Sequence, residues 1–215
     1  MLKRAGTFLV LGSVLLTGCL QKETTHTIYL APDGAAAWVV SEMNVHSDEK
    51  EAGKRVEEEQ QYIGPAILGA HGTARALAAL GPHGPARTTV LRDDRPFHVV
   101  TEARFSAIDR VLERLFLEMG IRSSASLVHG GEQTVLRVRL DFSRPLEERQ
   151  TPVSELAEAI EDFRFVLTEG RFGAVSGFDV TEGVSATLSR DWMDRAEKAY
   201  EAKGTTEFAL SWRVE

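Results

Sequence analysis

Cysteine is almost absent from this chain: Cys19 is the one cysteine among 215 residues. A single thiol cannot form a disulfide within the chain, and a cysteine-rich zinc site needs several thiolates, so both kinds of cross-link are excluded. The fold must therefore be held together by burial of apolar side chains. A chain of this length is long enough to build such a core.

Positive charge is also scarce and scattered. The formal net charge is -7, and Lys and Arg form no dense cluster anywhere in the sequence. Nucleic acids and anionic lipid surfaces are bound through basic patches. We therefore expect no nucleic-acid partner, and no motif in the sequence predicts a cofactor.

The motifs of common enzyme classes are missing or incomplete. No His-Glu-x-x-His sequence occurs. Gly64 and Gly69 have the spacing of a phosphate-binding loop, but Ala70 and His71 stand where Lys and Ser/Thr are needed. Segment 173–177 places its serine one position too late for a nucleophile elbow. These patterns predict no catalytic or cofactor-binding residue.

The histidines leave one alternative open. His46 and Asp48 could meet His71 and His83 in three dimensions and form a metal site. Scattered surface histidines are the simpler interpretation, because no pair has the spacing of metal ligands on one element. We therefore predict no metal site.

The N-terminal residues have the order of an export signal. Lys3 and Arg4 precede an apolar run from Phe8 to Leu16, and no acidic residue occurs before Glu23. A membrane-spanning helix needs about 20 predominantly apolar residues. This run is shorter and is interrupted by glycine and serine, so an export signal is favoured over a permanent transmembrane anchor.

The end of the apolar run identifies the kind of signal. Leu16, Thr17, Gly18 and Cys19 resemble the lipobox of bacterial lipoproteins. The resemblance implies that residues 1–18 are a signal peptide, that the Cys19 thiol receives a diacylglyceryl group, and that the new amine is often acylated. In Gram-negative members an Asp after the cysteine favours retention in the inner membrane. Its absence here implies the periplasmic face of the outer membrane, if the host is Gram-negative.

The mature chain divides into a short tether and a folded domain. Residues 19–25 are polar, so we expect a lipidated tether that lifts the domain off the membrane. Residues 26–215 form the domain. Removal of the signal peptide takes away Lys3 and Arg4 and shifts the net charge to -9.

Several short runs alternate between apolar and polar residues, as expected of strands with one buried face. Phe97, Val99 and Phe105 share one face of such a run, while His98 and Glu102 share the other. Turn-forming residues separate neighbouring runs and predict hairpins. The predicted strands are 26–30 with 38–46, 86–92 with 97–105, 122–128 with 133–142, 163–168 with 172–180, and a final strand from 206 onward.

The helical pattern is clearest in the middle of the chain. Apolar residues recur there at the 3.6-residue period from Ile108 to Met119, with Ser106 as the predicted N-cap and Gly120 at the end. The other predicted helices are 48–61, 73–80, 151–160 and 191–202.

The order of these elements predicts an α+β fold. Its sheet is largely antiparallel and built from successive β-hairpins, with helices packed on one face. The charged segment 142–151, which contains Pro145, is the expected boundary if the domain consists of two lobes.

We therefore expect a membrane-anchored envelope lipoprotein that acts as a non-catalytic binding or assembly module. It reaches the membrane through the lipid on Cys19. Its other partner is expected to be an envelope protein or an apolar ligand, bound by a sheet face or by the Gly- and Ala-rich segment 64–84. The alternative is a periplasmic hydrolase with a dispersed active site, for which Asp93 and Asp94 are candidate acids. A turn explains these two aspartates more simply.

Overall fold

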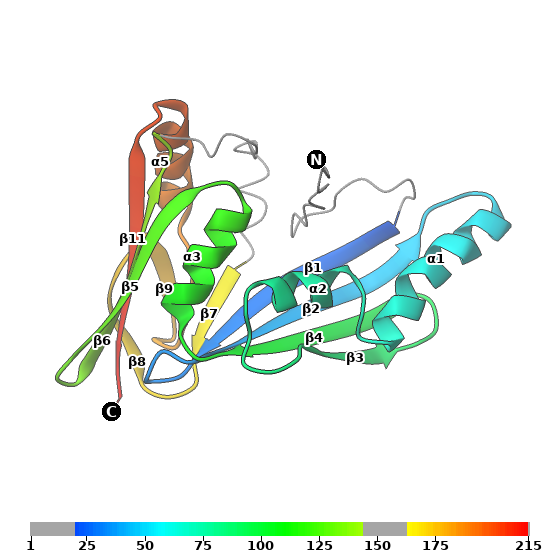
Figure 1. The fold of residues 1–215 in the computed structure, drawn as a ribbon, viewed down its shortest axis with the longest axis horizontal. Helices are drawn as coiled ribbons and strands as arrows, with labels where there is room; N and C mark the ends of the chain where they lie inside the picture. Colours follow the sequence, from blue (N-terminus) through cyan, green and yellow to red (C-terminus); the bar gives the residue numbers. More distant parts are fainter. Residues whose placement is uncertain (1–19, 144–162, 215) are drawn as a thin grey trace, which may run out of the picture.

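The computed structural model describes residues 20–143 and 163–214, which form an α+β fold of two sheets and four helices (Figure 1). We call the sheets the large sheet and the small sheet. The large sheet has the strand order β3 (Arg87–Arg92), β4 (Phe97–Phe105), β2 (Ala36–Ser47), β1 (Leu20–Leu30), β7 (Phe163–Leu167), β10 (Ser185–Leu188) and β9 (Phe178–Thr181). The small sheet has the order β5 (Arg122–Gly130), β6 (Gln133–Asp141), β11 (Thr205–Arg213) and β8 (Arg171–Ser176).

The described helices cover different sheets. Helices α1 (Ala52–Ile67) and α2 (Gly72–Ala79) lie along the large sheet, whereas α3 (Ile108–Glu118) and α5 (Arg190–Glu201) pack against the small sheet (Figure 1). Phe208 of β11 contacts both of the latter helices, with ring centroids 6.5 Å from Phe116 and 5.3 Å from Trp192. Both helices therefore lie on the same face of the small sheet. Within the described residues, no helix is both long and apolar enough to cross a membrane.

Three predicted hairpins are confirmed. β1 pairs with β2, β3 with β4, and β5 with β6, each antiparallel. Alternation sets their faces: Phe97, Val99 and Phe105 are buried while Arg104 is exposed. Because a strand has a period of two, the pattern of one strand is enough to fix which side of it meets the core.

The predicted hairpin of 163–168 with 172–180 is wrong. β7 pairs in parallel with β1, with Phe163 opposite His26, and antiparallel with β10. The expected second strand is divided at Gly177 into β8 and β9, which belong to different sheets. Gly177 has φ +85°, a conformation that favours glycine, and an added Cβ would come within 2.7 Å of Trp192. The chain can change sheets there because this residue has no side chain.

The expected tether is largely part of the fold. β1 begins at Leu20, which pairs with Ser47, and Gln21 pairs with His46. Residues 20–25 therefore belong to the large sheet rather than to a flexible linker. Cys19, the signal peptide, the predicted helix 151–160 and most of the predicted boundary 142–151 lie outside the described residues.

Helix α3 is confirmed, but its predicted cap is wrong. Its N-cap is Ala107, not Ser106, and no side chain caps it. The periodic apolar residues of α3 are buried, as the pattern predicted; they are Ile108, Val111, Leu112, Leu115 and Phe116. Tertiary burial of one face therefore stabilises this helix without help from a cap.

The turn between β1 and β2 joins the two sheets. The Trp212 indole nitrogen and the Thr134 hydroxyl both donate to the Pro32 carbonyl oxygen, at 3.3 and 3.2 Å. Gly34 in the same turn has φ +82°, and a side chain there would collide with Leu127 of β5. This close approach fastens the far end of β1 to the small sheet.

Candidate functional site

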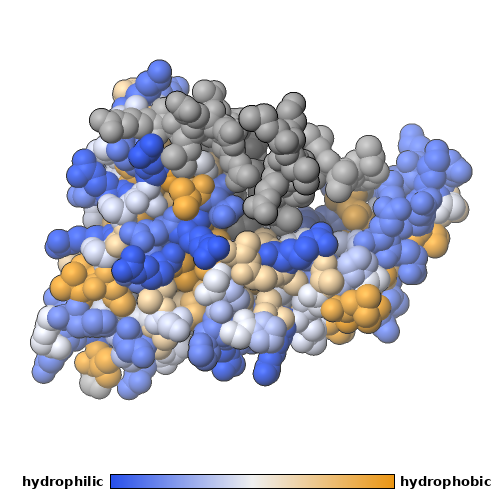
Figure 2. Space-filling model, in the orientation of Figure 1, coloured by the Kyte–Doolittle hydropathy of each residue, from blue (hydrophilic) through white to orange (hydrophobic). Residues whose placement is uncertain are grey.

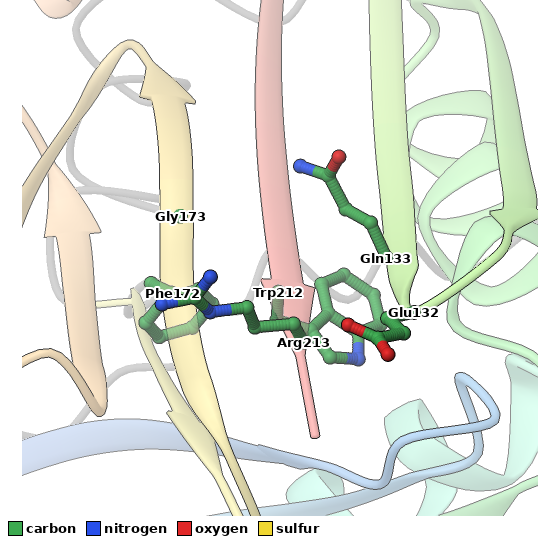
Figure 3. Close-up of a pocket in the computed structure, with 6 residues that line it drawn as sticks. All are labelled: Glu132, Gln133, Phe172, Gly173, Trp212 and Arg213. Carbon is green, nitrogen blue, oxygen red and sulfur yellow. The ribbon is translucent and has the colours of Figure 1, made fainter. Parts of the chain in front are cut away.

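A pocket of about 290 Å³ opens at the end of the small sheet (Figure 3). This volume lies at the lower limit of small-molecule sites, so it fits a small ligand or one side chain of a partner. Strands β6, β8 and β11 and the β5–β6 turn supply its walls. The lining residues are Glu132, Gln133, Phe172, Gly173, Trp212 and Arg213.

The pocket combines aromatic walls with charges of both signs. Trp212 is 1% exposed and Phe172 is 9% exposed, because both rings also belong to the core. The Arg213 side chain extends from β11 toward β8, and the Glu132 carboxylate lies on the side of β6 (Figure 3). Gly173 brings β8 close to β11, since an added Cβ would be 3.1 Å from the Ser211 hydroxyl. These lining groups can donate and accept hydrogen bonds and can make apolar contacts, so the pocket is suited to binding a ligand.

A second polar group of residues is buried beneath α2, around Glu42 of β2. Glu42 is 1% exposed, forms an ion pair with Lys22, and accepts from the Thr73 hydroxyl at 2.9 Å. His71 Nε2 lies 3.3 Å from the same carboxylate. Burial opposes ionisation, but the hydrogen bonds from His71 and Thr73 and the Lys22 charge outweigh it and lower the pKa of Glu42 to about 2. Because His71 and Thr73 begin α2, this carboxylate also complements the positive end of the helix dipole.

The buried group around Glu42 does not have the arrangement of a catalytic triad. His71 Nε2 faces both Glu42 and the Thr101 hydroxyl, the latter at 3.2 Å, while its Nδ1 has no partner among the described residues. A triad needs the acid and the nucleophile on opposite ring nitrogens. The buried Thr88 hydroxyl also lacks a hydrogen-bond partner among the described residues. Burial and the negative charge of Glu42 raise the pKa of Tyr62.

A second buried histidine lies on the same face of the large sheet. His26 is 4% exposed, and its Nδ1 accepts a hydrogen bond from the Trp38 indole nitrogen at 3.2 Å. Burial lowers the pKa of His26 to about 4, although the Glu42 charge acts in the opposite direction. The ring is therefore neutral near pH 7.

The structure separates the histidines that were considered as a metal site. His46 Nδ1 lies 2.6 Å from the Asn44 carbonyl oxygen, whereas His71 is buried under α2. In residues 20–143 and 163–214, no group of three or more His, Cys, Asp or Glu side chains is placed to hold a metal ion.

Asp93 and Asp94, the candidate acids of the hydrolase alternative, lie on the exposed turn between β3 and β4. The Asp94 carboxylate accepts two hydrogen bonds from Arg92, at 2.9 and 3.2 Å. The pocket of Figure 3 is on the other sheet. These aspartates therefore do not converge with the lining residues of the pocket.

Segment 64–84 covers the Glu42 group rather than an open groove. Its helix α2 packs on β4, and Leu77 is fully buried. Ile67 and Leu68 at the end of α1 are strongly exposed. Figure 2 shows that hydrophobic residues on the side it displays form small separate groups among hydrophilic ones. An apolar ligand for this segment stays a prediction.

Sequence reasoning missed the pocket and the buried carboxylate. The pocket residues come from three strands whose pairing no local pattern reveals. The position of Glu42 could have been predicted. It alternates in step with Trp38 and Val40 along β2, so its side chain lies on the buried face of the strand. A charged residue on a buried face needs a partner, and that requirement identifies the position.

Comparisons with known proteins give one weak structural match. No family model matches the chain, and no curated protein matches it. The chain is similar to the NMR structure of the folded domain of the LppM protein of Mycobacterium tuberculosis, with 10% sequence identity and a TM-score of 0.36. The match covers 94% of this chain and 95% of that one.

Proposed function

We propose that this chain is a lipid-anchored protein of the bacterial cell envelope whose domain binds a partner or ligand without catalysing a reaction. The observation that carries the proposal is the lipobox-like sequence from Leu16 to Cys19, which follows Lys3, Arg4 and an apolar run. Two or three acyl chains on Cys19 hold a protein durably at a membrane, whereas one chain holds it only marginally. The residue after Cys19 is leucine, which supports the periplasmic face of the outer membrane in a Gram-negative host.

Binding is favoured over catalysis by the composition of the pocket. Its six lining residues include no serine, cysteine or histidine that could act as a nucleophile or as its base. They do provide an exposed guanidinium and carboxylate beside two largely buried rings. The hydrolase alternative has no such support, since Asp94 is held by Arg92 on an exposed turn.

Fractionation of cells tests the anchor. We expect Cys19→Ser to abolish lipidation of the N-terminal peptide, and a Cys19→Ser protein whose signal peptide is removed at another site to leave the membrane fraction. Globomycin, which inhibits the lipoprotein signal peptidase, should block maturation of the natural protein. Gly18→Ala is the matched control, because a small residue still precedes Cys19, and it should fractionate as the natural protein does. Membrane association of the cleaved Cys19→Ser protein contradicts the proposal, whereas an uncleaved chain can stay at the membrane through its apolar run.

Crosslinking in living cells tests the binding site. A photoreactive amino acid at Gln133, on the pocket wall, should give a discrete crosslinked species that Arg213→Ala diminishes. The same reagent at Glu197, an exposed position on α5, is the control. If both positions give the same products, or if Arg213→Ala changes nothing, then the pocket is not the binding site.

A further inference from the structure

We infer that one end of the large sheet lies directly against the lipid headgroups and that the pocket faces away from them. We call the first region the anchor end; it consists of Leu20, Gln21, Ser47, Asp48 and the turn 93–95. This inference rests on the proposed lipidation of Cys19 and goes beyond it, because it assigns the surface that contacts the membrane and the direction in which the pocket is presented.

Cys19 directly precedes Leu20, the first residue of the large sheet. Cys19 is bonded covalently to Leu20, and consecutive Cα atoms are about 3.8 Å apart. Leu20 already pairs with Ser47, and the Gln21 side chain donates to Asp48 at 3.2 Å. A lipid attached to Cys19 therefore brings this end of β1 to the membrane surface.

The β3–β4 turn lies at the same end of the large sheet as Leu20. Arg95 donates to the Ser47 carbonyl oxygen at 2.8 Å and forms an ion pair with Glu59 of α1, also at 2.8 Å. The turn is thus fastened to the residue that pairs with Leu20. Leu91, which precedes Arg92 in β3, is 66% exposed. Arg92 is paired with Asp94 and Arg95 with Glu59, so these charges are balanced, and an exposed apolar side chain beside them suits the boundary between headgroups and acyl chains.

The length of β1 separates the anchor end from the pocket. Its eleven residues rise about 3.3 Å each, so the strand spans roughly 33 Å. At its far end the Pro32 carbonyl accepts from Trp212, which lines the pocket. Figure 1 shows the start of β1 and the small sheet toward opposite ends of the molecule. The pocket is therefore held away from the lipid and opens toward a partner in the aqueous compartment.

Quenching by spin-labelled lipid tests this orientation. Lipidation converts the Cys19 thiol into a thioether, so a new cysteine is the one reactive thiol in the mature protein. Asp93→Cys at the anchor end and Glu169→Cys in the β7–β8 turn would each carry a bimane fluorophore. Glu169 is the matched control, because it is exposed and adjoins Gly170, which lies against Arg213 of the pocket.

The protein would be purified with its lipid and placed in vesicles of phosphatidylethanolamine and phosphatidylglycerol with a nitroxide on the headgroup. We expect several-fold stronger quenching at position 93 than at position 169. A linker of ten Gly and Ser residues between Cys19 and Leu20 spans roughly 18 Å and should reduce the difference.

Equal quenching at the two positions without the linker, or stronger quenching at 169, overturns the inference. The mass of the N-terminal peptide is measured on the same sample. If the peptide is lipidated and the quenching is equal, then only the proposed orientation is contradicted. If Cys19 is unmodified, then the proposed lipid anchor is contradicted as well.

Discussion

The two ends of the molecule are stabilised in different ways. In the part of the large sheet covered by α1 and α2, which includes the anchor end, a small apolar cluster of five buried residues shares the interior with the charged residues Glu42 and Glu59. At the other end, formed by the small sheet with the helices and strands packed on it and called the pocket end below, the core is aromatic. The rings of Phe178 and Trp192 both meet Phe208 edge to face, with centroids 5.4 and 5.3 Å away. The anchor end therefore depends on paired charges and hydrogen bonds in addition to apolar contacts, whereas the pocket end depends on apolar burial.

The charged residues of the anchor end connect helix to sheet. The Glu59 carboxylate accepts from the Ser47 backbone amide at 3.0 Å and pairs with Arg95. The Glu42 carboxylate does the same for α2 through Thr73 and His71. The two helices at this end are therefore held to the sheet by carboxylates, in addition to their few buried apolar residues.

The largest effect is expected at the pocket end, from Trp192→Ala. This change removes a fully buried ring, so the free energy of unfolding should fall by about 4 kcal/mol, as measured by urea denaturation. Trp192→Phe is the control, because it keeps a ring and loses the 2.8 Å hydrogen bond to the Glu207 carbonyl. It should cost about half as much or less. If Trp192→Ala lowers the free energy of unfolding by less than Glu42→Ala does, then the aromatic core does not contribute more to stability than the buried charges.

The next effect is expected at the anchor end, from Glu42→Ala. It leaves Lys22, His71 and Thr73 without their acceptor, and breaking a buried pair in this way costs about 3 kcal/mol. Glu23→Ala on the same strand is the control, since that side chain is exposed and accepts from Asn44; it should change stability by less than about 0.5 kcal/mol. Equal urea midpoints for the two variants would show that the buried carboxylate contributes nothing.

The smallest effect is a pH dependence from His26. Its pKa is about 4 in the folded protein and 6.5 in the unfolded chain, so the unfolded chain binds more protons between these values. Stability is therefore fully present above pH 6.5 and is lost as pH falls toward 4, by about 2 kcal/mol between pH 7 and pH 5. Urea denaturation at the two pH values measures it.

His26→Gln sharpens this test, because the amide still accepts from Trp38 and does not titrate. It should reduce the loss between pH 7 and pH 5. The Glu42 carboxylate, whose pKa is lowered from 4.5 to about 2, contributes stability that is lost only below pH 4.5. An unchanged loss in His26→Gln would assign the acid sensitivity to other groups.

Local periodicity predicted much of the fold. Three hairpins, α3 and the final strand follow from alternation or from the 3.6-residue period, because each buries one face. The pairing of β7 with β1 could not be predicted this way, since it joins residues 137 positions apart that share no local pattern. The change of sheet at Gly177 was hidden for the same reason.

The tether was mispredicted because polarity was taken as a sign of a linker. Lys22 and Glu23 are polar, yet Lys22 pairs with Glu42 and Glu23 accepts from Asn44 of β2. A strand whose side chains find polar partners across the sheet needs no apolar alternation. Cys19 and the export signal stay predictions from the sequence, whereas the pocket could be found only from the strand order.

The parallel pairing of β7 with β1 has a consequence for folding. The N-terminal hairpin is synthesised first, but the free edge of β1 from His26 to Leu30 acquires its neighbour only after residues 163–167 have also been synthesised. Until then an unpaired edge stands beside the emerging chain and can recruit a wrong strand. A holding chaperone that covers this edge until β7 arrives would raise the yield of correctly folded molecules.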